Sequence, residues 1–322
     1  MARPGISIES LHARQRQAVL DAARTPRSWS GRGIVTSAYD RDFASAWVLL
    51  SELARLGVRT PIEVFSMPGE LSERHAALLA PLNLDLRLRP LQAQHSVRYF
   101  LKPHAIWQSG FREVLWLDTD NFPIRDPSFL FDDEEFQQKG SLFWRDVTGA
   151  ERAQLWHPAS PIWPLFNVPG NDAEEFETGQ LLVDKEKRLA ELALTLHFAS
   201  DAIYSDQLWT GDKDMFRLAW QNLAAARKKA PPGNAYLRDR DRVPYGFMPF
   251  GPFHMGRAND LGRWGGGTVM VQRDREGRAL FNHRNLDKFT LSGPNPHNSD
   301  IENEAIYHDH LARLKQRLAD AG

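Results

Sequence analysis

The chain contains no cysteine among its 322 residues, which excludes disulfide bonds, thiolate metal sites and cysteine nucleophiles together. It also lacks a long apolar run: stretches such as 46–50 fall far short of the roughly 20 residues that cross a bilayer. The opening residues, MARPG, carry a positive charge, but no apolar segment follows, so we do not expect a cleaved secretory signal. We therefore expect a cytoplasmic protein without a transmembrane segment, with peripheral membrane contact left open.

An excess of basic residues is absent as well. Lysine plus arginine total 40 and aspartate plus glutamate total 41, so the net charge is −1. Proteins that bind nucleic acid through counterion release usually carry a basic excess, and we therefore expect no nucleic-acid partner. The remaining composition, 42% hydrophobic and 25% charged residues, is that of an ordinary soluble enzyme.

Hydrophobic patterning predicts strands that alternate with helices. Apolar residues recur every three to four positions from Phe43 to Ala54, and 113–117 is a nearly continuous apolar run of strand length. Such alternation predicts βαβ units and a mostly parallel sheet covered on both faces. The expected strands are 34–36, 61–65, 84–88, 113–117 and 180–184, with a hairpin at 268–271 and 278–281. The expected helices are 43–54, 71–79, 99–107, 185–196, 214–228 and 303–318.

The domain organisation is simple. Residues 1–30 are rich in arginine and alanine and weakly helical, and we interpret them as a peripheral N-terminal leader. Residues 31–322 show no repeat and no break in composition, which predicts one α/β domain with a loop-rich C-terminal half. Four prolines in 157–170 indicate an ordered loop.

The strongest local signal follows the run at 113–117. Asp118 and Asp120 form a D-x-D motif there, and Pro123 closes the segment. In extended backbone, positions i and i+2 point to the same side, so both carboxylates can converge on one divalent cation. They would lie at the carboxyl end of a strand, where open α/β sheets bind ligands. The alternative is a polar turn that ends a buried strand.

The motif also fits a second enzyme class. Phosphatases of the haloacid-dehalogenase type carry a similar D-x-D with a later G-D-x-x-x-D, and 211–214 reads GDKD here. Two observations weigh against this class: Phe122 stands where it usually has threonine or valine, and the strand–helix units precede the motif instead of following it. A non-catalytic sugar-binding protein, which would need no metal, is the other alternative.

Three segments carry a family resemblance: LWLDTDNFPIRDPSFLFD (115–132), EFETGQLLVDKEK (175–187) and GDKDMFRLAW (211–220). In this order they resemble the fungal α-1,3-mannosyltransferase family and its bacterial relatives, and more distantly the glycogenin-like retaining transferases. The likeness runs from about Gly31 to about Lys288. It implies a GT-A fold, a Rossmann-like mixed sheet flanked by helices. It also implies a retaining hexosyltransferase, with GDP-mannose favoured as donor, a UDP-sugar as the alternative, and a carbohydrate or glycoconjugate acceptor.

The resemblance assigns the metal and the donor. Asp118 and Asp120 would bind Mn²⁺ or Mg²⁺ together with His283, with Asp120 the more direct ligand and Asp118 nearer the donor ribose. Lys102, on the helix before the motif, and Lys288 would bind the donor. His254 and His297 are weaker alternatives to His283, which could also be a surface histidine.

The same resemblance places sugar-binding residues. Thr178 and Gly179 would line the donor, because glycine allows close approach of the backbone to a ligand. Gln180, Asp212 and Asp214 are the candidate catalytic residues that hold the donor sugar. The alternatives are a strand-entry turn for 178–180 and a helix cap for the two acids. Asp206 competes with Asp212 for the same role, and Trp163 is the candidate for acceptor binding, although such aromatics more often anchor a loop.

Overall fold

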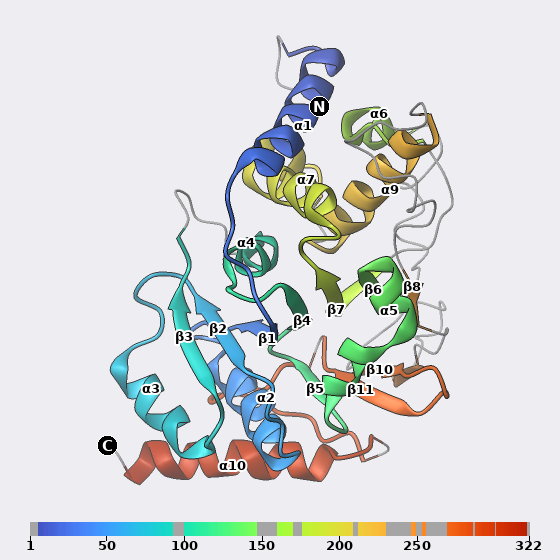
Figure 1. Ribbon diagram of the computed structural model, residues 1–322. Helices are drawn as coiled ribbons and strands as arrows, with labels where there is room; N and C mark the ends of the chain where they lie inside the picture. The colour runs from blue at the N-terminus through green and yellow to red at the C-terminus, as the bar shows by residue number, and fades with distance from the viewer. Residues whose placement is uncertain are drawn as a thin grey trace.

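The computed structural model describes residues 6–92, 100–146, 160–169, 176–208, 212–229, 246–248, 253–255, 269–285, 287–299 and 301–320. A seven-stranded sheet in the order β3-β2-β1-β4-β7-β6-β8 forms its centre, and a four-stranded sheet in the order β5-β11-β10-β9 adjoins it (Figure 1). The fold class expected from the sequence, a Rossmann-like mixed sheet flanked by helices, is confirmed.

The first half of the central sheet is parallel, as the alternation of strands and helices predicted. Its strands are β1 (Arg32–Ser37), β2 (Ile62–Ser66), β3 (Leu86–Pro90) and β4 (Glu113–Leu117). The second half reverses direction. There β7 (Phe176–Asp184) is antiparallel to β4, β6 (Ser141–Arg145) is antiparallel to β7, and β8 (Gly246–Phe247) is parallel to β6.

The apolar run of β4 is buried from both sides. Val114 and Trp116 belong to one hydrophobic cluster, whereas Leu115 and Leu117 belong to the other. A strand covered on both faces needs apolar residues at every position, which explains why the run is continuous rather than alternating.

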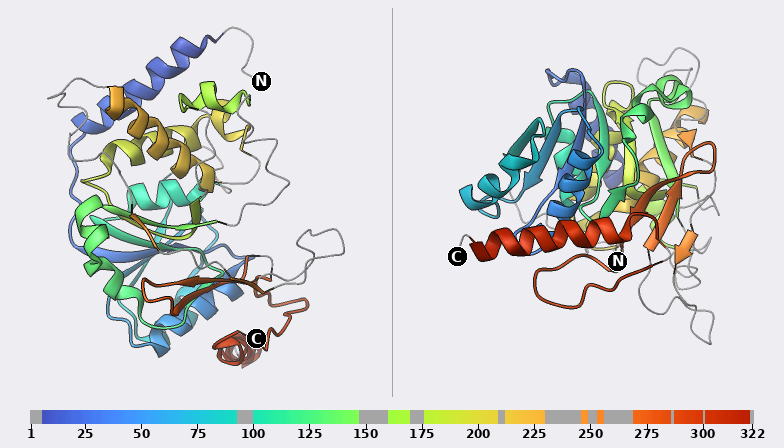
Figure 2. Two further views of the ribbon diagram at one scale, coloured as in Figure 1. Left: turned by 90° about the vertical axis from the view of Figure 1, so that its right-hand side faces the viewer. Right: turned by 90° about the horizontal axis from the view of Figure 1, so that it is seen from below.

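A layer of helices covers each face of the central sheet (Figures 1 and 2). One layer comprises α1 (Ile8–Arg24), α4 (Leu101–Gln108), α6 (Ile162–Phe166), α7 (Leu189–Ser200), α8 (Ala202–Ser205) and α9 (Lys213–Lys229). The other comprises α2 (Phe43–Arg55), α3 (Glu73–Leu79), α5 (Glu134–Lys139) and α10 (Glu304–Asp320). Short 3-10 segments lie at Ala80–Leu82 and Pro127–Asp132. Across the part of the chain that is described, no helix combines the length and the apolar character that a membrane crossing needs.

The small sheet contains the expected hairpin and two strands that were not expected, β5 and β9. β10 (Val269–Arg273) and β11 (Ala279–His283) pair antiparallel, and β9 (Phe253–Met255) extends them. β5 (Asn121–Pro123), directly after the D-x-D motif, pairs with β11 on the other side. The motif is therefore connected to the C-terminal hairpin through the backbone itself.

One sequence expectation needs correction and another is confirmed. β7 begins at Phe176 and not at Gln180, so Thr178 and Gly179 lie inside a strand and not in a turn before it. Pro123 closes the segment as expected: it is the last residue of β5, an edge strand, where a proline leaves no ladder bond unmade.

Candidate functional site

Backbone pairing brings distant parts of the chain together at the D-x-D motif. The N–H of Asp118 donates to the carbonyl of Gly179 on β7 at 2.7 Å. On the other side, Asn121 of β5 lies opposite His283 of β11. The N–H of Arg284 donates to the carbonyl of Asp120 at 2.8 Å. The motif is thus held between β7 and β11.

Three of the expected metal ligands meet at this point. Asp118, Asp120 and His283 each offer one ligand atom, and these atoms all lie within 4.8 Å of one another. Asp120 and His283 are buried, whereas the Asp118 side chain is 28% exposed, so the cluster opens on the Asp118 side. Two carboxylates and one imidazole form an oxygen-rich donor set that suits Mn²⁺ or Mg²⁺.

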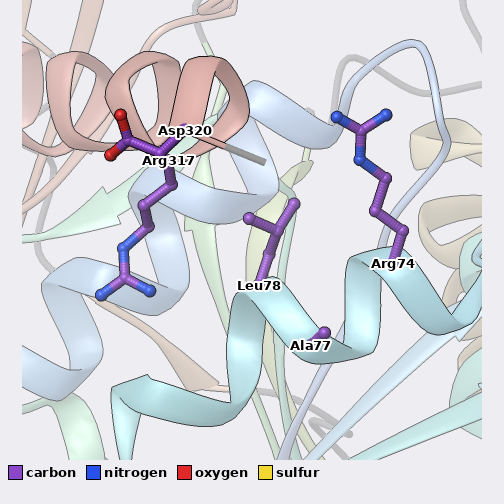
Figure 3. A pocket seen from close by; sticks show the side chains of 5 residues that line it. All are labelled: Arg74, Ala77, Leu78, Arg317 and Asp320. Carbon is purple, nitrogen blue, oxygen red and sulfur yellow. The ribbon is translucent and has the colours of Figure 1, made fainter. Parts of the chain in front are cut away.

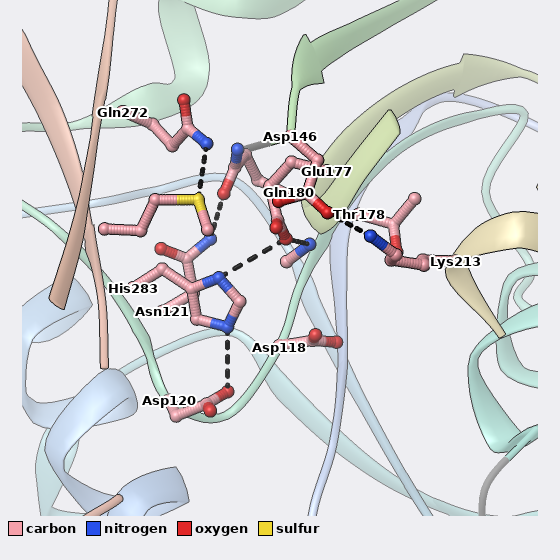
Figure 4. A network of polar contacts seen from close by, with 12 residues as sticks. Asp118, Asp120, Asn121, Asp146, Glu177, Thr178, Gln180, Lys213, Gln272 and His283 are labelled. Carbon is pink, nitrogen blue, oxygen red and sulfur yellow. Dashed lines mark hydrogen bonds and ion pairs between the residues drawn. The ribbon is translucent and has the colours of Figure 1, made fainter. Parts of the chain in front are cut away.

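The His283 ring lies between two carboxylates (Figure 4). Its Nε2 is 3.6 Å from Oδ1 of Asp120, and its Nδ1 is 3.3 Å from Oε1 of Glu177. Burial alone would lower the pKa of His283, but the two acids outweigh burial and raise it to about 10. The ring thus lies between two acids whose charge it compensates, and Nε2 is the nitrogen that faces Asp120.

Gly179 leaves the space that this ring occupies. A Cβ at position 179 would lie 2.5 Å from Nδ1 of His283 and 2.9 Å from Oε1 of Glu177. The Gly179 N–H also donates to Oε1 of Glu177 at 2.5 Å. The absent side chain of Gly179 thus allows the backbone of β7 to approach the His283 ring closely.

A second cationic side chain, Lys288, compensates the buried negative charge of Asp120. Lys288 Nζ contacts Oδ2 of Asp120, while Oδ1 has no hydrogen-bond partner among the described residues. Burial alone would raise the pKa of Asp120, but Lys288 and His283 hold it well below its usual range. The Lys288 side chain remains 45% exposed. It therefore lies where solvent and the buried carboxylate meet.

Lys102 is the centre of an adjacent group. Its Nζ forms ion pairs with two acids, 3.2 Å from Oδ1 of Asp118 and 3.3 Å from Oδ1 of Asp212. The same Nζ donates hydrogen bonds to Thr178, to the backbone carbonyl at 2.7 Å and to the side-chain hydroxyl at 3.0 Å. Burial alone would lower the pKa of Lys102, but the two acids raise it above its usual value. Burial, assisted by Asp118 and opposed by Lys102, raises the pKa of Asp212 to about 6. Lys102 thus joins the D-x-D motif to the start of α9.

The other candidate catalytic residues lie close to these groups along the chain. Gln180 lies opposite Leu117 in the sheet, and its Oε1 accepts a hydrogen bond from Nδ2 of Asn121 at 2.6 Å. Its Nε2 is buried and finds no partner within the described ranges. Asp214 lies in the first turn of α9 and is fully buried.

Several weaker candidates lie elsewhere. Trp163 is 3% exposed within a hydrophobic cluster, so its ring packs in the core and presents no open face to a sugar. His297 is exposed, with its ring 4.8 Å from that of His308, and Asp206 is exposed after α8. His254 is on β9, and its side chain falls outside what the structure describes.

Two contributors were not identified from the sequence. Oε1 of Glu177 lies 3.3 Å from Nδ1 of His283 as an ion-pair partner, although a single acid in a strand gave no signal of its own. Trp116 donates from Nε1 to Oδ1 of Asp118 at 2.7 Å. The spacing of two between Trp116 and Asp118 could have indicated this contact, because it puts both on one side of the strand.

A surface cavity of about 320 Å³ lies between α3 and α10, lined by Arg74, Ala77, Leu78, Arg317 and Asp320 (Figure 3). It shares no residue with the metal cluster. We assign it no part in the site.

Comparison with known proteins connects the motif region to mannosyltransferases. The family model described as "Mannosyltransferase putative" matches residues 31–157. Alpha-1,2-mannosyltransferase MNN2 of Saccharomyces cerevisiae is 25% identical over 211 residues, which cover 53% of this chain and 35% of the yeast protein. Alpha-1,2-mannosyltransferase MNN21 of Candida albicans is 31% identical over 97 residues, 30% of this chain and 13% of that protein. The chain thus spans about a third of the length of MNN2.

Solved structures of glycosyltransferases are also similar. Galactosyltransferase LgtC, in complex with donor and acceptor sugar analogs, matches with a TM-score of 0.48 at 12% identity over 87% of this chain and 95% of LgtC. The glycosyltransferase GlyE of Streptococcus pneumoniae matches with a TM-score of 0.39 at 16% identity over 68% of this chain and 46% of GlyE.

Proposed function

We propose that this protein is a metal-dependent retaining glycosyltransferase of the GT-A type that transfers mannose from GDP-mannose to a sugar hydroxyl. The observation that carries the proposal is the convergence of Asp118, Asp120 and His283 at the carboxyl end of β4. The similarity to mannosyltransferases, which for the family model covers 31–157 and so includes Asp118 and Asp120, supports the choice of mannose as the sugar.

The residues present fit a divalent cation. Oδ1 of Asp120 is buried without a hydrogen-bond partner among the described residues, and Asp118 leaves the cluster open on one side. When bound, Mn²⁺ or Mg²⁺ stabilises the negative charge that develops on the nucleoside diphosphate as it leaves. Asp118, Asp120 and Nε2 of His283 would hold it, while Glu177 keeps Nδ1 of the imidazole in place.

The cationic side chains have different tasks in this proposal. Lys288 is half-exposed beside Asp120, so it can turn to a diphosphate without leaving the site. Lys102 is buried and already bonded to Asp118, Asp212 and Thr178, so it fixes the acids around the donor and acts as a positioning residue.

Three residues would position the transferred sugar. Asp212 is held by Lys102 beside the D-x-D motif, whereas Asp206 is exposed, which favours Asp212 as the acid that binds sugar hydroxyls. Gln180 has a free amide N–H₂ group in the same region, and Asp214 follows Asp212 on α9.

Retention of configuration is inferred from the family resemblance, and the pairing of the acids bears on how it would occur. Asp118 is paired with Lys102, Asp120 with Lys288, and Glu177 with His283. A carboxylate bound to a cation is a weakened nucleophile, so a glycosyl–enzyme intermediate on these acids is disfavoured. Attack by the acceptor hydroxyl on the same face as the leaving diphosphate fits this arrangement, with a phosphate oxygen accepting the proton.

Release of nucleoside diphosphate from GDP-mannose and from UDP-sugars, with Mn²⁺ or with EDTA, tests the proposal. We expect release from GDP-mannose that requires the metal and falls at least ~10³-fold in Asp120→Asn. Asp126→Asn is the matched control, because Asp126 is an exposed acid six residues later that caps a 3-10 turn. Release that is indifferent to EDTA, or equal in wild type and Asp120→Asn, would contradict the proposal.

A further inference from the structure

A second cavity, of about 380 Å³, lies at the opposite end of α4 from Lys102. Trp107 and Gln108, at the end of the helix, line this cavity, whereas Lys102 near its start reaches the D-x-D motif. Five residues of helix separate the two ends, a rise of about 8 Å. The cavity shares no lining residue with the metal cluster, so it is a separate site.

The cavity contains a guanidinium group whose donors are unsatisfied. Nε and Nη2 of Arg27 are shielded from solvent and have no hydrogen-bond partner in the described part of the chain. Arg89, the other lining arginine, is already occupied, because its Nη1 donates to Oε1 of Glu63 at 2.8 Å. Of the described lining residues, none is acidic. Buried donors of a charged group are costly to leave unpaired, so Arg27 calls for an anionic acceptor such as carboxylate or phosphate.

Two indole rings surround this guanidinium. Cζ of Arg27 lies 5.2 Å from the ring centroid of Trp29 and 5.5 Å from that of Trp107. The two rings meet edge to face, with centroids 5.5 Å apart and an interplanar angle of 84°. Cation–π contact holds the guanidinium against the rings but satisfies none of its N–H groups. The cavity thus combines hydrogen-bond donors for an anion with indole surface that suits the apolar C–H face of a sugar ring.

The walls of the cavity are fixed without a ligand. Lys185 Nζ donates to the carbonyls of Ile106 and Ser109 at 3.0 and 2.7 Å, and it lies 4.2 Å from the Trp29 centroid. Gln92 and Gln108 exchange two hydrogen bonds of 2.8 and 2.7 Å. A preformed cavity of this kind loses little conformational entropy when a ligand binds.

We propose that this cavity binds an anionic saccharide, a sugar ring that carries a phosphate or carboxylate group, with Arg27 binding the anion and Trp29 and Trp107 contacting the ring. The site is independent of the metal cluster and of the function proposed for it. Its ligand could be part of a larger glycan or a free sugar acid or sugar phosphate, since both present the same chemistry.

Calorimetric titration of the full chain in EDTA tests the proposal with four probes: mannose 6-phosphate, glucuronate, neutral mannose and inorganic phosphate. We expect saturable binding of at least one anionic sugar, at least ~10-fold tighter than binding of mannose or of inorganic phosphate. Tight binding of mannose 6-phosphate together with weak binding of glucuronate would identify phosphate as the recognised group. The reverse order of affinities would identify carboxylate.

Variants locate the binding. Arg27→Gln should weaken binding of the anionic sugar at least ~10-fold. Trp107→Leu should also weaken binding of the anionic sugar, but it should leave the affinity for inorganic phosphate unchanged. Arg24→Gln, an exposed arginine in the last turn of α1, is the matched control, and Asp120→Asn should bind the probe as wild type does. Arg27→Met removes the charge, keeps a side chain of similar length, and provides a second variant should Arg27→Gln fold poorly. Absence of saturable binding for both anionic sugars, or affinity unchanged in a folded Arg27 variant, would overturn the proposal.

Discussion

Replacing Gly179 by alanine would displace His283 from the metal cluster. The added Cβ would lie 2.5 Å from Nδ1 of His283 and 2.9 Å from Oε1 of Glu177, well inside van der Waals contact. The side chains of His283 and Glu177 are only 6% and 7% exposed, so neither can retreat into solvent. The 3.3 Å contact between the two would have to open, and the ring would turn away from Asp120.

The size of the effect follows from this geometry. Overpacking a close-packed site costs typically ~1–3 kcal/mol of folding free energy. Losing the group that orients a metal-binding histidine typically lowers metal affinity ~10–100-fold. We therefore expect Gly179→Ala to bind Mn²⁺ at least ~10 times more weakly than wild type and to unfold at a lower temperature.

Titration of the metal-free protein with Mn²⁺, followed by the EPR signal of the free ion, measures this affinity without any substrate. Gly110→Ala is the matched control, because the nearest atom to its added Cβ would be Oε1 of Glu63 at 3.4 Å, an ordinary contact outside the cluster. Equal Mn²⁺ affinity in Gly179→Ala and wild type would refute the role given to the Gly179–His283 contact.

Two further changes test neighbouring contacts. Asp212→Asn should depress turnover strongly and leave GDP affinity unchanged, because GDP lacks the transferred sugar; unchanged turnover would make Asp212 a helix cap only. Glu52→Gln should lower the free energy of unfolding at pH 7 by roughly 3–5 kcal/mol in denaturant titrations, since fully buried Glu52 binds Arg55 and His310. Burial would raise the pKa of Glu52, but these partners lower it below its ordinary 4.5, so the difference should shrink as pH falls below that value. Equal stability of Glu52→Gln and wild type at pH 7 would contradict the stabilising role given to these contacts of Glu52.

Much of the parallel half of the fold could be predicted, because burial on both faces leaves a clear signal. The run at 113–117 matches β4 (Glu113–Leu117), and the expected helices at 43–54 and 303–318 match α2 and α10 to within two residues. The approach of His283 to the D-x-D motif was inferred from the resemblance to a family. The pairing of β5 with β11, which brings His283 to the motif, was not predicted.

The remaining features depend on partners distant in the chain. Pro123 reads locally as a stop and is the last residue of β5, but the partner that makes 121–123 a strand, β11, comes much later in the chain. Residues 176–179 contain a charge and a glycine, which disfavour a strand locally, but pairing of Phe176 and Glu177 with β6 extends β7 over them. Glu177 is a buried acid whose charge His283 and Lys213 compensate, and no local pattern encodes these pairings.

Calorimetric measurement of GDP affinity with and without Mn²⁺ tests most directly whether Asp118, Asp120 and His283 form a metal site that binds a nucleoside diphosphate. We expect Mn²⁺ to tighten GDP binding to the wild-type protein at least ~10-fold, a difference of about 1.4 kcal/mol. Asp120→Asn should lose this gain, and Asp126→Asn should keep it. GDP affinity that is the same with and without Mn²⁺, or a gain that persists in Asp120→Asn, would contradict the metal site on which the proposed function depends.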